Sequence, residues 1–361
     1  MFRILLTSLA MCAVLCAAES ADPFDSRSYT PGASGLVITR FTPGAQAAQL
    51  GLQIGDIIVS YAGRPMRTQA ELLAAVKDGT ADAAVEVQRD GKPITVTAKP
   101  GKLGIYMTPV EAGKTLALPL DTGVVFSTAR LRTAPIDTWY DFIIDGKKAG
   151  AEHARIELVG DRVTIAVEVM FDGGEKWGLN HMIETGVLDV SGSAPRVVTQ
   201  IHEAPLGGFR SSGRWKDAAT WELTVDSRDE AGALVHEVST STPTGPLIND
   251  YSFSYLPALM PATEGACHHT RTVPATEAQP TGWSALMELA PEEIRIGADA
   301  VRLVRMEQRS LRGTGWVAWV KDGEVMKHDY SGGQGTTISV KTSKEQALTG
   351  LNPKLVPRTG K

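Results

Sequence analysis

The sequence is poor in cysteine, in clustered basic residues and in long hydrophobic runs, and each shortage excludes a class of protein. Three cysteines in 361 residues are too few for a disulfide scaffold. Lys plus Arg number 36 against 41 Asp plus Glu, without a basic block, so no nucleic-acid partner is expected. Beyond the first residues, no stretch approaches the roughly 18 consecutive apolar residues of a transmembrane helix. The remaining class is a globular protein long enough for about two domains.

The first 18 residues have the pattern of a secretory signal peptide. One cation, Arg3, precedes an apolar run over residues 4–15, and small residues lead up to Ala18. The run is shorter than the roughly 20 residues that span a bilayer, so we expect cleavage after Ala18 rather than a retained anchor. Leu15 precedes Cys16 where lipoprotein signals have Gly, Ala or Ser, so lipidation is not expected. We therefore expect export to the periplasm or the extracellular space, with Cys267 as the only thiol left.

The following residues predict a small α+β domain. Its start and stop signals include a capping box, in which Thr68 and Glu71 bond reciprocally to each other's amides and open a helix with Leu72, Leu73 and Val76 on one face. The expected elements are a strand over 35–41, a helical turn over 45–50 that ends at Gly51, a strand over 55–61, and a hairpin of 85–89 and 94–97 around Asp90-Gly91.

Four motifs in this order carry a resemblance. They are Pro43-Gly44 with Ala47-Ala48, Gly51-Leu52, Gly55-Asp56-Ile57-Ile58, and Leu72-Leu73. Together they resemble a PDZ domain of the bacterial, circularly permuted type found in secreted and intramembrane proteases. The resemblance implies a PDZ domain over residues 29–111. It further implies that peptide or protein C-termini bind as an added strand beside the long helix.

A PDZ domain holds the terminal carboxylate with the amides of an apolar-Gly-apolar loop, and that pattern occurs at Leu103, Gly104 and Ile105. The resemblance thus implies that this segment is the carboxylate loop. The opposite wall of the groove would be formed by Gln69, Leu72, Leu73 and Val76. Two alternatives stay open: the segment is an edge strand with a glycine bend, or the groove is unused.

Residues 126–350 predict a mainly antiparallel β-rich domain, either a curved sheet or a half-barrel, after a linker over 112–125 and before a tail over 351–361. Short apolar-polar alternations separated by Gly and Asp turns support this class. The expected strands cover 140–144, 153–159, 163–169, 196–201, 220–225, 234–238, 301–308, 316–320, 324–328 and 336–340. Trp139-Tyr140 near the start and Trp319-Val320 near the end weakly resemble bacterial domains of unknown function that are similar to lipoprotein-carrier half-barrels.

Candidate chemistry in this region is sparse. His202-Glu203 and His236-Glu237 lack the second histidine of a zinc-protease helix, and Ser331-Gly332-Gly333 lies in an expected loop. Cys267-His268-His269 is interpreted as loop residues, because adjacent side chains rarely share a metal. The acidic pairs Glu292-Glu293 and Asp226 with Asp229-Glu230 are interpreted as solvated turns. We therefore predict no catalytic residue, no metal and no cofactor.

All seven tryptophans follow residue 138, where they either fill the core of the sheet or line an apolar cavity. Two functions remain. The first is an exported, non-catalytic PDZ protein that binds peptide or protein C-termini, with the β-rich module as a scaffold or second partner-binding unit. The alternative is a periplasmic carrier of a hydrophobic ligand, docked to a protease or envelope complex through the PDZ domain. The interior of the β-rich module discriminates them: a closed apolar cavity of several hundred cubic ångströms favours the carrier, and a solid core filled by tryptophan favours the scaffold.

Overall fold

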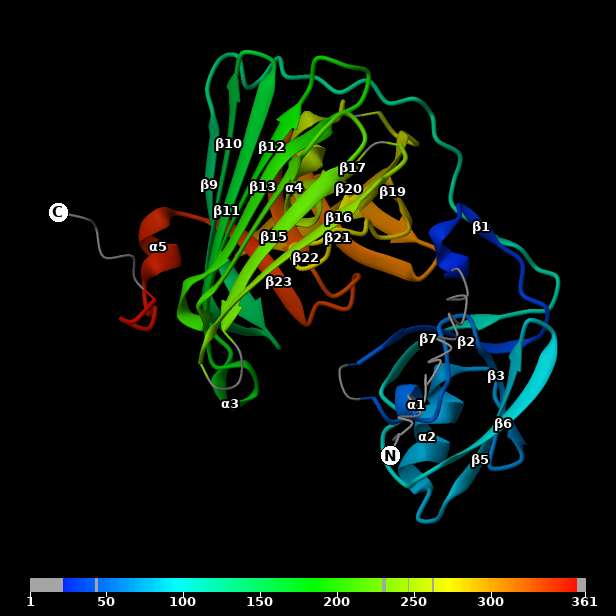
Figure 1. Ribbon diagram of the computed structural model, residues 1–361. Helices are drawn as coiled ribbons and strands as arrows, with labels where there is room; N and C mark the ends of the chain where they lie inside the picture. The colour runs from blue at the N-terminus through cyan, green and yellow to red at the C-terminus, as the bar shows by residue number, and fades with distance from the viewer. Residues whose placement is uncertain (1–21, 43–44, 229–231, 246, 262, 356–361) are drawn as a thin grey trace, which may run out of the picture.

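The computed structural model describes residues 22–42, 45–228, 232–245, 247–261 and 263–355. The predicted signal peptide, the Pro43-Gly44 motif and the Asp229-Glu230 pair lie outside the described residues. The chain forms two modules, a smaller one from the N-terminal part and a larger one from the rest (Figure 1). No helix within the described part of the chain is long and apolar enough to cross a bilayer.

The N-terminal module is built on one sheet with the strand order β6-β5-β3-β2-β7, and β4 pairs with β3. The strands are β2 (Gly35–Phe41), β3 (Ile57–Tyr61), β4 (Arg64–Pro65), β5 (Ala83–Arg89), β6 (Lys92–Ala98) and β7 (Ile105–Val110), and the helices are α1 (Gln46–Gln49) and α2 (Gln69–Asp78). Neighbouring β2 residues alternate between two apolar clusters, Leu36 and Ile38 with α2, and Val37 on the other side of the sheet.

Helix α2 begins with the expected capping box. The hydroxyl of Thr68 accepts from the amide of Glu71, and the Glu71 carboxylate accepts from the amide of Thr68. Leu72 is buried in the core of this module, whereas the side chain of Leu73 is 62% exposed and Val76 is half-buried. The helix therefore packs through Leu72 and Val76, and Leu73 faces away from the core.

The C-terminal module is mostly β structure, as expected. Its strands form one 15-stranded sheet with the order β16-β15-β14-β13-β12-β11-β10-β9-β23-β22-β21-β20-β19-β18-β17, antiparallel except for the pair β17 and β18. The first half comprises β9 (Ile136–Ile144), β10 (Lys147–Val159), β11 (Arg162–Asp172), β12 (Leu179–Asp189), β13 (Arg196–Ala204), β14 (Phe209–Trp215), β15 (Trp221–Arg228) and β16 (Leu234–Ser241). The second comprises β17 (Leu247–Asn249), β18 (Cys267–Val273), β19 (Trp283–Ile296), β20 (Asp299–Ser310), β21 (Gly313–Lys321), β22 (Glu324–Asp329) and β23 (Thr337–Thr342).

Three interpretations of this region were wrong. Asp226 does not lie in a turn but inside strand β15, where its carboxylate bonds to His236 of β16. Cys267-His268-His269 is not a loop but the start of the buried strand β18. Glu292-Glu293 is not a solvated turn, because it lies inside the long strand β19, where Glu292 accepts from the indole of Trp319 and pairs with Arg305. In these places the local sequence does not show a clear strand pattern, and hydrogen bonding to the neighbouring strands determines that the chain is extended.

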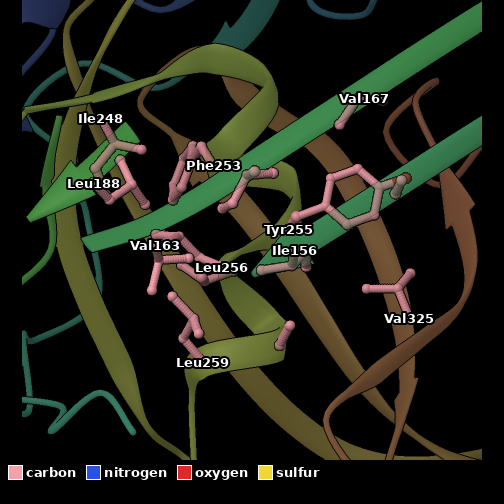
Figure 2. Packing of buried hydrophobic residues seen from close by; sticks show 14 of the residues in the cluster. Ile156, Val163, Val167, Leu188, Ile248, Phe253, Tyr255, Leu256, Leu259 and Val325 are labelled. Carbon is pink, nitrogen blue, oxygen red and sulfur yellow. The ribbon is translucent and has the colours of Figure 1, made fainter. Parts of the chain in front are cut away.

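The sheet curls around a short segment of chain, α4 (Asp250–Tyr255) followed by the 3-10 helix η3 (Leu256–Leu259). Phe253, Tyr255 and Leu256 are buried, and Figure 2 shows them among side chains of β10, β11 and β12. The ends of the sheet approach each other across this segment: Gln200 on β13 donates to the carbonyl of Pro274 over 3.0 Å, and Ser241 on β16 donates to that of Ala278 over 2.6 Å.

The C-terminal segment packs on the outside of the same sheet. Helix α5 (Lys344–Leu348) is capped by Ser343, whose hydroxyl accepts from the amide of Gln346. Ala347 and Leu355 are buried in a cluster with Ala151 and Met170. The chain beyond Gly350, expected to be a tail, therefore packs against the sheet as far as Leu355.

The two modules contact each other through the turn between β20 and β21. Leu311 at this turn is buried in the cluster that contains Val37 of β2 and Phe24 of the 3-10 helix η1 (Pro23–Asp25). Next to it, Arg312 donates to the carbonyl of Thr39 and pairs with Asp22. The contact uses the sheet face opposite to α2.

Leu311→Ala is expected to weaken this contact by about 2–4 kcal/mol, because it removes buried methyl groups and leaves a cavity. In scanning calorimetry, the N-terminal module should then unfold in a separate transition at lower temperature. Leu234→Ala, on a side chain that is 73% exposed, is the matched control and should leave the thermogram unchanged. Superimposable thermograms for Leu311→Ala and the unmodified protein would contradict the docking role.

Candidate functional sites

The predicted carboxylate loop directly precedes β7. Gly104 has φ +73°, in the left-handed region, and a Cβ at this position would lie 2.6 Å from Oγ1 of Thr42 and 2.8 Å from Cβ of Ala45. The carbonyl of Leu103 accepts from the amide of Ala47 over 3.0 Å, and the carbonyl of Gly104 accepts from that of Thr42 over 2.8 Å. Only glycine fits this close approach, and both carbonyls are held against the start of α1.

These two hydrogen bonds fix the direction of the next amides. Because a trans peptide unit points its N–H opposite to its C=O, the amides of Gly104 and Ile105 point away from α1. Two successive outward amides are the arrangement that an incoming carboxylate requires. The geometry supports Leu103, Gly104 and Ile105 as a carboxylate loop, although Leu103 itself is buried in the core.

Strand β7 pairs with β2 on one side and lies at the edge of the described sheet on the other. The side-chain amide of Gln69, on α2, donates to the carbonyl of Met107. The backbone groups of Met107 therefore face α2, and alternation along the strand gives Ile105 and Pro109 the same direction. Pro109 has no N–H, which is tolerated at an edge. An added strand would find amides at Ile105 and Met107 and none at Pro109.

The predicted groove residues thus differ in their positions. Gln69 bridges α2 and β7, Leu73 is exposed on α2, and Val76 and Ile105 are half-buried beside the core. Leu72, although on the same helix, is 1% exposed and belongs to the core.

A second site lies inside the C-terminal module and was not expected from the sequence. Glu152 on β10 is completely buried and accepts hydrogen bonds from the hydroxyls of Tyr255 and Ser339. The hydroxyl of Tyr330 lies 2.7 Å from Oε1 of Glu152 and 3.1 Å from Nδ1 of His328. We call Glu152, Tyr255, His328, Tyr330 and Ser339 the Glu152 network. A carboxyl group, an imidazole and three hydroxyls therefore form one connected group in the interior.

The proton positions in this network follow from its geometry. Nε2 of His328 lies 2.8 Å from the carbonyl of Ser254, which can only accept, so Nε2 carries a proton. The single proton of the Tyr330 hydroxyl cannot serve both Nδ1 of His328 and Oε1 of Glu152. A further proton is therefore needed, either on Glu152 or on Nδ1 of His328.

Burial decides between these two positions. Desolvation raises the pKa of Glu152, against the opposing effect of its hydroxyl donors, and lowers the pKa of His328 to about 4. We conclude that Glu152 is protonated and His328 neutral. Every hydrogen bond in the Glu152 network then has a proton, and every group in it is uncharged. This is the arrangement that costs least in a dry interior.

A cavity adjoins the Glu152 network. It has a volume of about 280 Å³, is partly open to solvent, and lies between α4 and the sheet. Its lining comprises Phe142, Val169, Phe171, Met182, Ser254, Trp316, Tyr330 and Thr337. Tyr330 is shared, with its hydroxyl in the network and its side chain in the cavity wall.

The sequence did contain a signal for this site. Glu152, Ala154 and Ile156 occupy alternate positions of β10 and share one buried face of the strand, so a carboxylate lies among apolar residues. A buried carboxylate on such a face requires partners, which often marks a site of function.

The cluster Cys267-His268-His269 shows no comparable arrangement. Burial raises the pKa of the Cys267 thiol to about 11, which keeps it protonated and unreactive. His269 bonds to the carbonyl of Pro119 over 2.6 Å, and His268 packs edge-on against Phe126. Among the described residues there is no group of three or more His, Cys, Asp and Glu side chains that could hold a metal ion.

Comparison with known proteins gives one informative similarity. No family model matches the chain. Over 107 residues, 29% of the chain, the sequence is 34% identical to a probable periplasmic serine endoprotease DegP-like of Pseudomonas fluorescens. The match spans only about 21% of that protein's length. The similarity is compatible with a PDZ-like domain, a kind of domain that such periplasmic proteases contain.

Glu152→Gln should be tolerated far better than Glu152→Ala, because a carboxamide is uncharged and keeps a donor and an acceptor. The alanine variant removes the carboxyl partner of the Tyr255 and Ser339 hydroxyls and leaves a cavity, which should cost about 3–5 kcal/mol of unfolding free energy. Urea unfolding followed by tryptophan fluorescence measures this in the C-terminal module, which holds every tryptophan. Equal losses in both variants would contradict a neutral network.

The pH dependence tests the proton on Glu152 directly. Above the ordinary pKa of 4.5, the unfolded chain loses this proton while the folded chain keeps it, so stability falls as pH rises. Glu152→Gln lacks this fall, so its stability relative to the unmodified protein should rise as the pH increases above 4.5, at up to about 1.4 kcal/mol per pH unit. His328 acts oppositely in both proteins, since the unfolded chain takes up a proton below pH 6.5. A pH-independent difference would contradict the assignment.

Proposed function

We propose that this chain is an exported, non-catalytic protein whose N-terminal module is a PDZ domain that captures peptide or protein C-termini by strand addition. The observation that carries the proposal is the loop at Gly104, where two tied carbonyls turn successive amides outward beside an edge strand. The partial similarity to a periplasmic protease supports both the PDZ assignment and export.

Peptide entry would begin at the edge of β7. The carbonyl of Met107 is the acceptor that an added strand needs, and Gln69 occupies it in the structure. Gln69 would therefore release Met107 as the peptide pairs, and its amide would become available to the peptide. The missing N–H at Pro109 limits pairing to the stretch next to the carboxylate loop, which favours short C-terminal segments over long extended ones.

Peptides that end in an apolar residue with a free carboxylate are expected to bind to the full-length protein, and C-terminally amidated peptides should bind at least about tenfold more weakly. The reason is the charge-assisted hydrogen bonds that only the carboxylate makes to the loop amides. Fluorescence anisotropy of labelled peptides from a C-terminal library measures this. Equal affinity for amidated peptides would rule out the carboxylate loop.

Gly104→Ala provides the matched structural test. Its Cβ would clash with Thr42 and Ala45, so the loop should shift and peptide affinity should fall about tenfold without unfolding of the module. Gly113→Ala is the control, because Gly113 has the same φ of +73° but nothing within 4 Å of its Cβ position. If both variants bind peptide alike, the site lies elsewhere.

The carrier alternative remains as a second candidate, because the interior of the C-terminal module contains a cavity of about 280 Å³. Tryptophan side chains contribute both to the core and to the cavity: Trp221 is completely buried, and Trp316 lines the cavity. In this candidate function the module would hold a hydrophobic ligand while the PDZ domain docks the protein to a protease or envelope complex.

A further inference from the structure

The cavity of the C-terminal module is built to stay open. Tyr330 forms part of its wall, and the tie of its hydroxyl to Glu152 and His328 keeps the ring from collapsing inward. Phe142 on β9 and Phe171 on β11 contact each other across β10, with ring centroids 5.1 Å apart. The pocket is partly open to solvent, and a concave, mostly apolar pocket with fixed walls is the usual form of a small-molecule binding site.

The lining sets the polarity of that ligand. Most of the wall is aromatic and aliphatic, and its polar groups are the hydroxyls of Ser254, Tyr330 and Thr337. The eight lining residues include no charged side chain, and the ionisable groups behind Tyr330 form a neutral pair. A charged group in this cavity would lose its hydration without a counter-charge, so an uncharged ligand is favoured.

The volume sets the size. An apolar cavity of about 150 Å³ is known to hold benzene, and this cavity of about 280 Å³ is nearly twice as large. It therefore accommodates a two-ring aromatic molecule or a medium-length aliphatic chain. The three hydroxyls come from different elements, α4, β23 and the residue after β22. One hydrogen-bonding group on the ligand would therefore contact one of them.

We propose that this cavity binds a small uncharged amphiphile, with an aliphatic or aromatic body against Phe142, Phe171, Met182 and Trp316 and one hydrogen-bonding group toward the hydroxyls of Ser254, Tyr330 or Thr337. This inference names the ligand class of the carrier candidate. It does not rest on peptide capture, because the cavity lies in the other module.

The test uses the full-length protein and the neutral fluorescent probe N-phenyl-1-naphthylamine. We expect saturable binding and competition by decanol, with decanoate at pH 8 at least tenfold weaker as a competitor. Met182→Trp and Thr337→Trp, which fill the cavity from β12 and β23, should each weaken probe binding at least tenfold. Two positions are used so that one misfolded variant does not end the test, and tryptophan fluorescence and thermal unfolding verify folding.

Val238→Trp, on a side chain of β16 that is 54% exposed, is the matched control and should bind the probe normally. Both filled variants should still bind C-terminal peptides as the unmodified protein does, which separates this inference from the proposed PDZ function. Absence of saturable probe binding, or full binding by folded cavity-filled variants, would overturn the cavity assignment. Equal competition by decanoate would overturn the requirement for an uncharged ligand.

Discussion

A 15-stranded sheet that curls until its ends approach must enclose an interior, and the segment Asp250–Leu259 packs within it. This segment brings backbone polar groups into an apolar space where each needs a partner. The carbonyl of Ser254 receives its donor from His328, and that bond requires a proton on Nε2 of the imidazole. The buried histidine, and through Tyr330 the buried Glu152, are consequences of placing an irregular segment inside a sheet.

The same constraint explains why the Glu152 network and the cavity are adjacent. Polar groups around Ser254 have to be arranged for hydrogen bonding rather than for close packing. An aromatic ring such as that of Tyr330, whose hydroxyl is held by hydrogen bonds, cannot move to fill the remaining space. Tyr330 belongs to both features, since its hydroxyl completes the network and its ring bounds the void. The ionisable groups beside the cavity are therefore paired and neutral, so a ligand would meet hydroxyl groups rather than a charge there.

Local patterns in the sequence predicted much of the architecture but not its interior. Alternation and Asp-Gly turns located the hairpin of β21 and β22, and the Thr68 capping box located α2, because these signals act between near neighbours. Strand β18 was missed, since Cys267-His268-His269 becomes a strand only through its ladder with β19. The Glu152 network joins residues up to 187 positions apart, such as Glu152 and Ser339, and no local pattern encodes that contact.

Strand β2 links the proposed peptide groove to the contact between the two modules. Ile38 lies opposite Met107 of β7, the strand to which a peptide would add, and Val37 packs in the cluster that contains Leu311. Arg312 bonds to the carbonyl of Thr39, directly beside the register shift between β2 and β7. The turn between β20 and β21 thus holds the strand that supports the proposed groove. A captured C-terminus would be presented at a fixed orientation to the C-terminal module, rather than on a tether that moves independently.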